Sequence, residues 1–385
     1  MKAVQFGAGN IGRGFVGLLL AEGGYEVVFS DVASDLVAAI NAQTEYTVHE
    51  VGPGGVDRVV TGFRAVDSKA DPDAAADEVA TADVVTCAVG PTVLRFIAPT
   101  IVAGLTRRSR DAAPVKIMAC ENAIGATDLL RAEIERVAGA DATDILSRAV
   151  FANTAVDRIV PAQPEGAGVD VTVEPYFEWT IEAGPFGGDL PNIPGAHFVD
   201  DLAPYIERKL FTVNTGHAAT AYFGARAGIE RISDALDEPQ IAAAVTAALE
   251  ETSAVLSAVH GMDPADLAAY RATILDRFRN PALVDTVQRV GRQPLRKISR
   301  HERFIGPAAA AAEHGLSSAA LVAAVGAALA FEDADDPQAV ELQQLLRSDD
   351  ARTFTTRTTG LEPQHPLFAA VEEIVAARQD ALRTL

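Results

Sequence analysis

The first half of the chain alternates short apolar runs with segments of helical periodicity. The apolar runs are Lys2–Phe6, Glu26–Ser30, Asp83–Val89 and Lys116–Cys120. The segments with helical spacing are Ile11–Glu22 and Asp35–Gln43. Strands that are apolar almost throughout are typical of a parallel sheet covered on both faces. The succession of strand, helix and strand therefore predicts an α/β, Rossmann-type, doubly wound parallel sheet.

The pattern changes in the second half of the chain. Val169–Ile181 alternates as half-exposed strands do, and the glycine- and proline-rich stretch Pro185–Pro194 is typical of a linker. From Leu202 onward almost every segment has helical spacing, including the alanine-rich stretch Pro307–Ala330. We therefore expect a Rossmann-type domain over residues 1–192 and a mostly α-helical C-terminal domain over residues 193–385.

A glycine-rich motif follows the first predicted strand. Gly7-Ala8-Gly9-Asn10-Ile11-Gly12 has the G-x-G-x-x-G spacing and opens a predicted helix, which is the context of a dinucleotide-binding turn. The helix N-terminus offers N–H groups and a partial positive charge to a diphosphate. The candidate cofactor-binding residues of this segment are Phe6, Gly7, Ala8, Gly9, Asn10, Ile11, Gly12, Arg13 and Gly14.

Asp31 lies at the end of the second strand, 19 residues after Gly12. A carboxylate there accepts hydrogen bonds from ribose hydroxyls and repels a ribose phosphate, which favours NAD over NADP. FAD shares the fingerprint, and a glycine turn without a nucleotide is the structural alternative. Val89 and Gly90 end a later strand, where a turn either lines the ligand crevice or simply closes the strand.

A second polar motif lies in the C-terminal half, where Lys209, Asn214 and His217 are spaced over nine residues. On an α-helix, at about 100° per residue, Asn214 lies roughly 140° from Lys209, with His217 between them at roughly 80°. Three polar groups thus share one broad face among apolar neighbours. Taken singly, each has an ordinary structural explanation, as a surface lysine, a helix cap or a core histidine.

The spacing Lys-x-x-x-x-Asn-x-x-His resembles the signature of the polyol-specific long-chain dehydrogenase/reductase family. Other segments are similar to that family, from residue 1 to about residue 340. These segments are Phe6–Phe15, Ala88–Pro91, Cys120–Asn122, Ala155–Pro161, Leu190–Gly195, Glu207–Ala218 and Val290–Lys297. The resemblance is strongest to the branch that acts on mannitol 1-phosphate, and implies NAD-dependent, reversible oxidation of that substrate to fructose 6-phosphate.

The resemblance also implies roles for single residues. Lys209 would be the general acid–base, Asn214 and Asn122 would bind the reacting oxygen, and His217 would orient the substrate. No metal is expected. Because a free lysine has a pKa near about 10.4, a lysine base acting near neutrality requires a drop of roughly 3 units, which burial and a positive nicotinamide ring favour. Amide donors stabilise an oxyanion without ionising.

A phosphate on the substrate requires cations. The densest basic stretch contains Arg289, Arg292, Arg296, Lys297, Arg300 and Arg303, and Arg158 and Arg208 are further candidates. Guanidinium groups bind phosphate through paired hydrogen bonds, but any of these arginines could instead pair with surface carboxylates. We take Arg158, Arg292, Arg296 and Lys297 as phosphate candidates. The alternatives are a polyol or hexuronate dehydrogenase with an unphosphorylated substrate, and a non-catalytic NAD-sensing protein.

Length, charge and cysteine content narrow the classes further. A chain of 385 residues suits two domains, and a net charge of −21 disfavours nucleic acid and anionic membranes as partners. No apolar run of roughly 18 residues stands out as a membrane span. With only two cysteines, the composition favours a reduced, cytoplasmic setting and no thiolate metal cage. The family resemblance favours a monomer.

Overall fold

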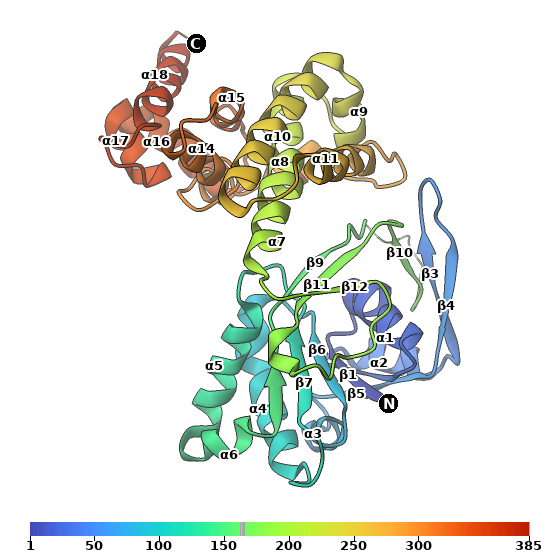
Figure 1. Ribbon diagram of the computed structural model, residues 1–385. Coiled ribbons are helices and arrows are strands. Elements are labelled where there is room, and N and C mark those ends of the chain that lie inside the picture. The colour runs from blue at the N-terminus through green and yellow to red at the C-terminus, as the bar shows by residue number, and fades with distance from the viewer. Residues whose placement is uncertain (162, 164–165, 385) are drawn as a thin grey trace. The chain divides into compact units, whose positions relative to one another are not determined.

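Six parallel strands form the central sheet of the first half of the chain (Figure 1). The structure is a computed structural model and describes residues 1–161, 163 and 166–384. The strand order is β5-β2-β1-β6-β7-β8, and every neighbouring pair is parallel. The strands are β1 (Lys2–Phe6), β2 (Glu26–Asp31), β5 (Phe63–Asp67), β6 (Val84–Cys87), β7 (Val115–Ala119) and β8 (Ala149–Phe151). The predicted doubly wound parallel sheet is confirmed.

Apolar cores cover both faces of this sheet because successive strand residues point to opposite sides. In β1, Ala3 belongs to one core and Val4 to the other, and both are fully buried. The first core contains α1 and α2, and the second contains α3, α4, α5 and α6. These helices are α1 (Leu18–Glu22), α2 (Ser34–Asn41), α3 (Pro72–Ala80), α4 (Leu94–Arg107), α5 (Ala126–Ala138) and α6 (Ala142–Leu146). Burial on both faces explains why the inner strands β1, β2, β6 and β7 are apolar almost throughout.

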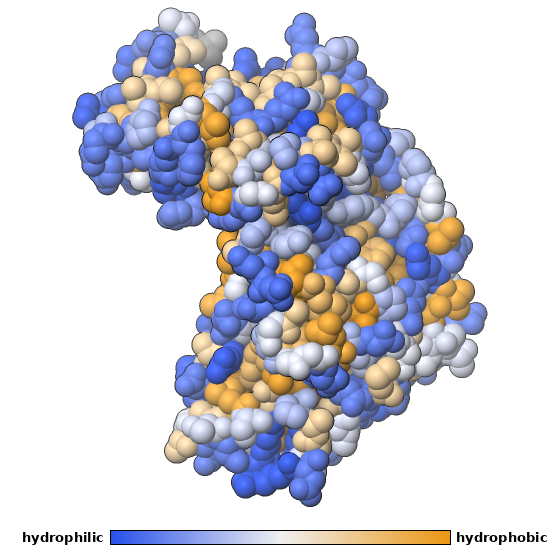
Figure 2. Space-filling view, viewed as in Figure 1, coloured by the Kyte–Doolittle hydropathy of each residue, from blue (hydrophilic) through white to orange (hydrophobic). Residues whose placement is uncertain are grey.

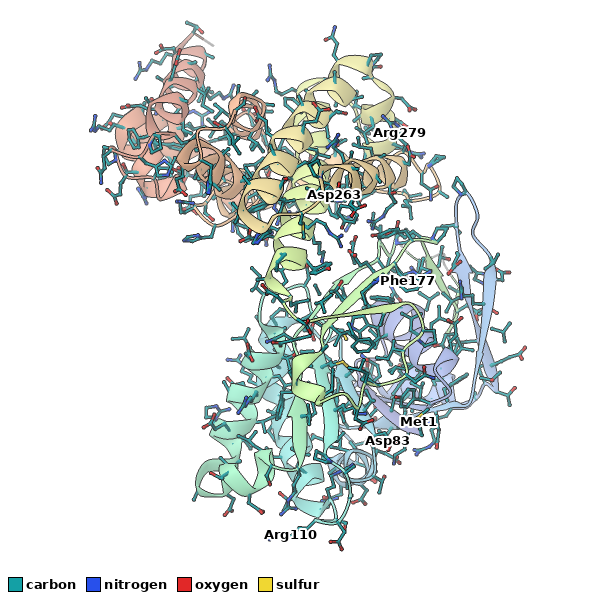
Figure 3. All side chains as sticks on the ribbon, viewed as in Figure 1. Met1, Asp83, Arg110, Phe177, Asp263 and Arg279 are labelled. Carbon is teal, nitrogen blue, oxygen red and sulfur yellow. The ribbon has the colours of Figure 1, made fainter. Side chains whose placement is uncertain are left out.

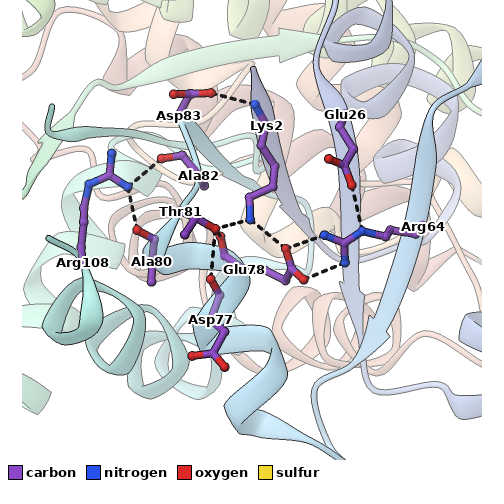
Figure 4. A network of polar contacts seen from close by, with 10 residues as sticks. All are labelled: Lys2, Glu26, Arg64, Asp77, Glu78, Ala80, Thr81, Ala82, Asp83 and Arg108. Carbon is purple, nitrogen blue, oxygen red and sulfur yellow. Dashed lines mark hydrogen bonds and ion pairs between the residues drawn. The ribbon is translucent and has the colours of Figure 1, made fainter. Parts of the chain in front are cut away.

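Ion pairs join the strands and α3 at the edge where the strands begin (Figure 4). The Arg64 guanidinium of β5 donates to Glu78 of α3 at 2.7 and 2.6 Å and to Glu26 of β2 at 2.8 Å. Lys2 Nζ lies 2.8 Å from Glu78. The hydrogen bond from Arg64, opposed by burial and aided by Lys2, lowers the pKa of the Glu78 carboxyl. This network fixes the edge opposite to the one that carries the glycine-rich turn.

Two three-stranded sheets extend the first half of the chain. One has the order β10-β3-β4 and the other β12-β11-β9. Their strands are β3 (Glu45–Glu50), β4 (Asp57–Thr61), β9 (Thr154–Asp157), β10 (Val171–Val173), β11 (Glu178–Glu182) and β12 (Ala196–Val199). The alternation over Val169–Ile181 correctly predicted strands, whereas β3, β4, β5, β8, β9 and β12 were not predicted from the sequence.

The chain divides into two compact units, Met1–Tyr205 and Ile206–Leu385, within helix α7 (Ala203–Arg208). The sequence analysis placed its boundary after residue 192 and interpreted Pro185–Pro194 as a linker. In the structure this stretch is part of the first unit. The Asn192 backbone N–H donates to Tyr25 Oη at 3.2 Å, its side-chain amide donates to Gly23 O at 3.0 Å, and Ile193 is buried. The linker interpretation was therefore wrong, because glycine and proline here shape a tightly held segment.

The second unit is built from helices, as the periodicity after Leu202 predicted. Its helices are α8 (Thr215–Arg226), α9 (Ile232–Asp237), α10 (Pro239–His260), α11 (Pro264–Phe278), α12 (Val287–Gly291), α13 (Pro294–Lys297), α14 (Ile305–Glu313), α15 (Ala319–Ala328), α16 (Pro337–Ser348), α17 (Ala351–Thr359) and α18 (Phe368–Arg383). The stretch Pro307–Ala330 is two helices, α14 and α15, rather than one. Asp263, labelled in Figure 3 with Arg279 at the other end of α11, caps that helix by accepting from the Ala265 N–H at 2.7 Å.

Among the described residues, α10 is the one helix long and apolar enough to cross a membrane by length and composition. No membrane span was predicted from the sequence. The apolar residues of α10 pack against α8, α14 and α15, with Val245 and Leu249 completely buried. This packing accounts for its composition as that of a central core helix. On the visible face, hydrophilic residues cover most of both units, with smaller apolar patches among them (Figure 2).

Candidate active site

The glycine-rich turn joins β1 to a π-type turn, Gly12–Gly17, which precedes α1. Gly7 has φ +88°, in the left-handed region that favours glycine. A Cβ on Gly12 would lie 2.0 Å from the Gly7 carbonyl oxygen, so this position also requires glycine. A Cβ on Gly9 would meet nothing within 4 Å. Gly9 thus leaves its backbone open to a ligand, which is the arrangement a bound diphosphate needs.

Asp31 holds the same turn from the neighbouring strand. Its Oδ2 accepts from the Ala8 N–H at 2.7 Å, and its Oδ1 accepts from the Ala33 N–H at 2.9 Å. Asp31 therefore connects the end of β2 to the glycine-rich turn, at the edge where the sequence analysis expected the ribose. Gly9 and Asn10 are exposed there, and Ile11 is half-buried.

The structure corrects the expectation for the Arg13 side chain, which the sequence analysis placed among the cofactor-binding residues. The Arg13 guanidinium is buried, donating from Nε to Val169 O at 2.9 Å and from Nη1 to Ala8 O. Burial lowers the pKa of this guanidinium, although Tyr46 and Asp31 oppose the effect. Arg13 braces the turn from inside the protein, so its side chain does not point toward a diphosphate.

We expect Asp31→Ala to relax the preference for NADH over NADPH. Two like charges about 4 Å apart near a protein surface repel by roughly 1–4 kcal/mol, so the ratio of the two kcat/KM values should fall by about tenfold or more. Asp67, which pairs with Asp31 in register on β5, provides the control Asp67→Asn. Steady-state kinetics with both cofactors checks this. A ratio unchanged in Asp31→Ala would show that another group discriminates the cofactors.

Glu121 connects the end of β7 to the turn after β6. Its Oε1 accepts from the Val89 N–H at 2.8 Å, and its Oε2 accepts from the Gly90 N–H at 2.9 Å. Glu121 is buried, and Asn122, the next residue, is exposed. The carboxylate thereby fixes the predicted cofactor turn and the chain that carries Asn122. Glu121 was not among the predicted site residues, although an acid directly after an apolar strand is a signal for one.

Lys209 and Asn214 are the first and last residues of a second π-type turn, which leads into α8. The Thr215 N–H donates to Leu210 O, five residues back, and the Thr215 hydroxyl donates to Arg303 O at 2.6 Å. The α-helical spacing used in the sequence analysis therefore does not hold over these residues. An i→i+5 ring instead widens the turn that joins Lys209 to Asn214, and such turns are frequent at functional sites.

His217 lies in the first turn of α8, where its environment is fixed on two sides. Its ring stacks on Phe278 with centroids 4.8 Å apart, and its Nε2 lies 3.1 Å from Asp285 Oδ2. Lys209, Asn214 and His217 are all half-buried. The second unit therefore brings the lysine, the amide and the imidazole together on consecutive turns. Asp285 was missed because it is distant in sequence.

Two of the predicted phosphate ligands are buried. The Arg158 side chain is fully buried, lying 2.8 Å from Glu50 and donating to the Glu174 and Gly14 carbonyl oxygens. Lys297 is buried in the second unit, where Nζ donates to Val290 O, and burial lowers its pKa to about 7. Arg158 is thus a structural residue of the first unit, and the prediction that it binds phosphate is not supported by its position.

The arginines of the basic stretch all have carboxylates within ion-pair distance. The pairs are Arg289–Asp285 at 2.6 Å, Arg292–Asp333 at 4.0 Å, Arg296–Glu302 at 2.7 Å, Arg300–Glu313 at 2.9 Å and Arg303–Glu302 at 3.1 Å. These contacts agree with the alternative interpretation, in which the arginines pair with carboxylates. Arg292 has the longest of these contacts, and its side chain is 53% exposed. It is the predicted phosphate ligand that is most available to an anion.

Most of the chain matches a known pair of domains. Residues 1–195 match the profile described as the mannitol dehydrogenase Rossmann domain, and residues 201–372 match the mannitol dehydrogenase C-terminal domain. This chain belongs to the mannitol dehydrogenase family. The family resemblance seen in the Lys209, Asn214 and His217 spacing is confirmed.

Full-length relatives within the mannitol dehydrogenase family share about half or more of their residues with this chain. Mannitol-1-phosphate 5-dehydrogenase of Paenarthrobacter aurescens is 58% identical over 379 residues, which cover 98% of this chain and 99% of that protein. The protein of the same name from Ajellomyces capsulatus is 51% identical, covering 97% of each chain.

Solved structures of polyol dehydrogenases share the fold of this family member. Mannitol 2-dehydrogenase of Pseudomonas fluorescens, solved as a ternary complex with NAD and D-mannitol, superposes with a TM-score of 0.75 at 20% identity. That comparison covers 100% of this chain and 94% of the other. A D-sorbitol dehydrogenase gives a TM-score of 0.78 at 18% identity, covering 100% and 93%.

Proposed function

We propose that this chain catalyses the reversible, NAD-dependent oxidation of D-mannitol 1-phosphate to D-fructose 6-phosphate. The observation that carries the proposal is the end-to-end similarity to mannitol-1-phosphate 5-dehydrogenases, at 58% identity over 98% of the chain. The complete set of Lys209, Asn214 and His217 on adjoining turns supports a catalytic rather than a sensing role.

The glycine-rich turn and Asp31 would hold NAD, which accepts a hydride from the carbon being oxidised. The opening at Gly9, next to the tight contacts at Gly7 and Gly12, fits a diphosphate. The Glu121 carboxylate holds the turn at Val89 and Gly90 in one conformation. These residues bind and orient the cofactor, and take no part in proton transfer.

Lys209 would accept the proton of the C5 hydroxyl as the C5–H bond breaks, and would return it when fructose 6-phosphate is reduced. Asn214 and Asn122 would donate hydrogen bonds to the reacting oxygen, stabilising its partial negative charge in both directions. His217 would hold a neighbouring hydroxyl and orient the substrate. In this scheme the chain's own groups handle the proton and the oxygen charge without a metal.

For the phosphate we propose Arg292 as the first ligand to test, with Arg296 second. The long contact of 4.0 Å to Asp333 leaves Arg292 the least committed of the paired arginines. A guanidinium can bind a phosphate through two parallel hydrogen bonds. We also expect a monomeric enzyme, as the family resemblance implies, in the reduced setting of the cytoplasm that a content of only two cysteines favours. The net charge of −21 disfavours nucleic acid and anionic membranes as partners.

The experiment follows the loss of NADH absorbance with fructose 6-phosphate and, in parallel, with fructose. We expect rapid turnover with the phosphate alone and, in Arg292→Gln, a KM for fructose 6-phosphate raised by about tenfold, since one charge-assisted hydrogen bond is worth roughly 1.5–3 kcal/mol. The KM for NADH should not change. Turnover with fructose alone would assign an unphosphorylated substrate, and turnover with neither would overturn the proposal.

A further inference from the structure

The His217–Asp285 contact is part of a buried, ordered arrangement within the second unit. Asp285 is 6% exposed and lies in the segment between α11 and α12, 68 residues after His217. Its Oδ2 lies within ion-pair distance of both His217 Nε2, at 3.1 Å, and Arg289 Nη2, at 2.6 Å, and its Oδ1 accepts from Arg289 Nε at 2.7 Å. The carboxylate therefore contacts an imidazole and a guanidinium at once.

The backbone around Asp285 is held independently of these side chains. The Ile232 N–H, at the start of α9, donates to Asp285 O at 3.1 Å, and the Val287 N–H donates to Glu230 O at 2.9 Å. These bonds surround the isolated bridge between Arg231 and Thr286. Asp285 is thus positioned by the fold before any ligand arrives.

Packing fixes the imidazole from the other side. The Phe278 ring lies almost parallel to the His217 ring, at 15° with centroids 4.8 Å apart. A Cβ on Gly216 would come within 3.2 Å of the Phe278 ring, so the glycine before His217 lets this ring approach the helix. The imidazole is therefore held in its plane by Phe278 and in its rotation by Asp285.

We infer that Asp285 is a positioning residue that fixes the tautomer and orientation of His217. An ionised carboxylate can only accept hydrogen bonds, so its position beside Nε2 favours the neutral imidazole tautomer that carries the proton on Nε2. Nδ1 is then the ring nitrogen that presents a lone pair to a substrate hydroxyl. This inference rests on the proposed role of His217 in holding the substrate.

The electrostatics around Asp285 favour its ionised form. Burial by itself raises the pKa of the Asp285 carboxyl, but His217 and Arg289 outweigh that effect and lower the pKa below its ordinary value. The acceptor therefore stays charged wherever the enzyme is folded near neutral pH. Arg289 takes part as the second partner of the carboxylate and as a counter-charge for a buried anion.

The first test compares Asp285→Asn with Glu313→Gln, which removes a carboxylate 2.9 Å from another histidine, His365. For Asp285→Asn we expect kcat/KM for fructose 6-phosphate to fall by roughly 10- to 100-fold and KM for NADH to change by less than about twofold. Glu313→Gln should be near wild type in both. Wild-type kinetics in Asp285→Asn would overturn the inference.

The second test separates positioning from a merely structural role. In a His217→Ala background, adding Asp285→Asn should lower kcat/KM for fructose 6-phosphate by less than about twofold further, because the two residues act as one unit. If both losses multiplied in full, Asp285 would act independently of His217 and the inference would be wrong. Melting temperatures of all variants identify any loss due to unfolding.

The tautomer of His217 can be measured directly by NMR of wild-type protein labelled with ¹⁵N-histidine, with His217→Ala to assign the signal. At a pH where the ring is neutral, the proton should be on Nε2; a proton on Nδ1 would overturn the inference. This measurement needs neither turnover nor a folded Asp285 variant. If the enzyme reduced neither sugar, the proposed function would fail, while the tautomer would still decide the role of Asp285.

Discussion

Replacing Lys209 by alanine should lower turnover with fructose 6-phosphate by about 100-fold or more, since a positioned acid–base group contributes roughly 10²–10⁴. Lys209 opens the π-type turn and is half-buried, and Asn214 and His217 follow it on the next turns. With Lys209 absent, the hydroxyl proton has no proposed acceptor among these three residues, whereas the glycine-rich turn is unchanged. NADH affinity, measured by fluorescence titration, should therefore remain near wild type.

Two comparisons separate proton transfer from simple charge at residue 209. Lys209→Arg keeps a positive charge, but a guanidinium holds its proton at any working pH and should be nearly as inactive as Lys209→Ala. A small primary amine added to Lys209→Ala should restore part of the lost turnover. Near-normal activity in Lys209→Ala would show that a different group carries the proton.

Arg158→Met should destabilise the first unit by roughly 3 kcal/mol or more, since removing one partner of a buried ion pair typically costs about 3–5 kcal/mol. Arg158 has no exposed side-chain surface, donates to Glu174 O and lies 2.8 Å from Glu50. Its guanidinium also lies 5.5 Å from the centre of the Phe177 ring, labelled in Figure 3. The change would remove a hydrogen-bond donor from the Glu174 and Gly14 carbonyl oxygens. Of the two guanidinium partners of the Glu50 carboxylate, Arg58 would remain.

Denaturant unfolding followed by tryptophan fluorescence measures the free energy of unfolding of the first unit. Trp179, the single tryptophan of the chain, is completely buried in the core of the first unit. Arg383→Met provides the control, because Arg383 and its partner Asp380 are both largely exposed and contribute little. If Arg158→Met kept full stability but raised the KM for fructose 6-phosphate, Arg158 would be a phosphate ligand after all.

The two structural corrections to the candidate site share one cause. Arg13 and Arg158 stand in segments that resemble the family, and a sequence cannot tell whether a guanidinium faces a ligand or a carbonyl oxygen inside the protein. Both are buried and donate to backbone oxygens distant in sequence, Arg13 to Val169 O and Arg158 to Gly14 O. Their partners depend on how the small sheets pack against the glycine-rich turn.

Local pattern was sufficient for the features that depend on neighbouring residues. The apolar runs predicted β1, β2, β6 and β7 because these strands are buried on both faces of the central sheet. The glycine spacing predicted the turn because Gly7 and Gly12 meet local steric demands, while Gly9 leaves the backbone open. Periodicity after Leu202 likewise predicted the helical unit. These features require no knowledge of which distant segments come together.

Tertiary structure alone decided the contacts that join distant residues. Glu121 fixes a turn 32 residues earlier, and Asp285 reaches His217 across 68 residues. The π-type turn at Lys209 was also invisible to periodicity, since the sequence spacing is compatible with an ordinary helix. Spacing along the chain specifies which side chains share a turn. Which acid lies beside that turn depends on how distant elements pack, as Glu121 and Asp285 show.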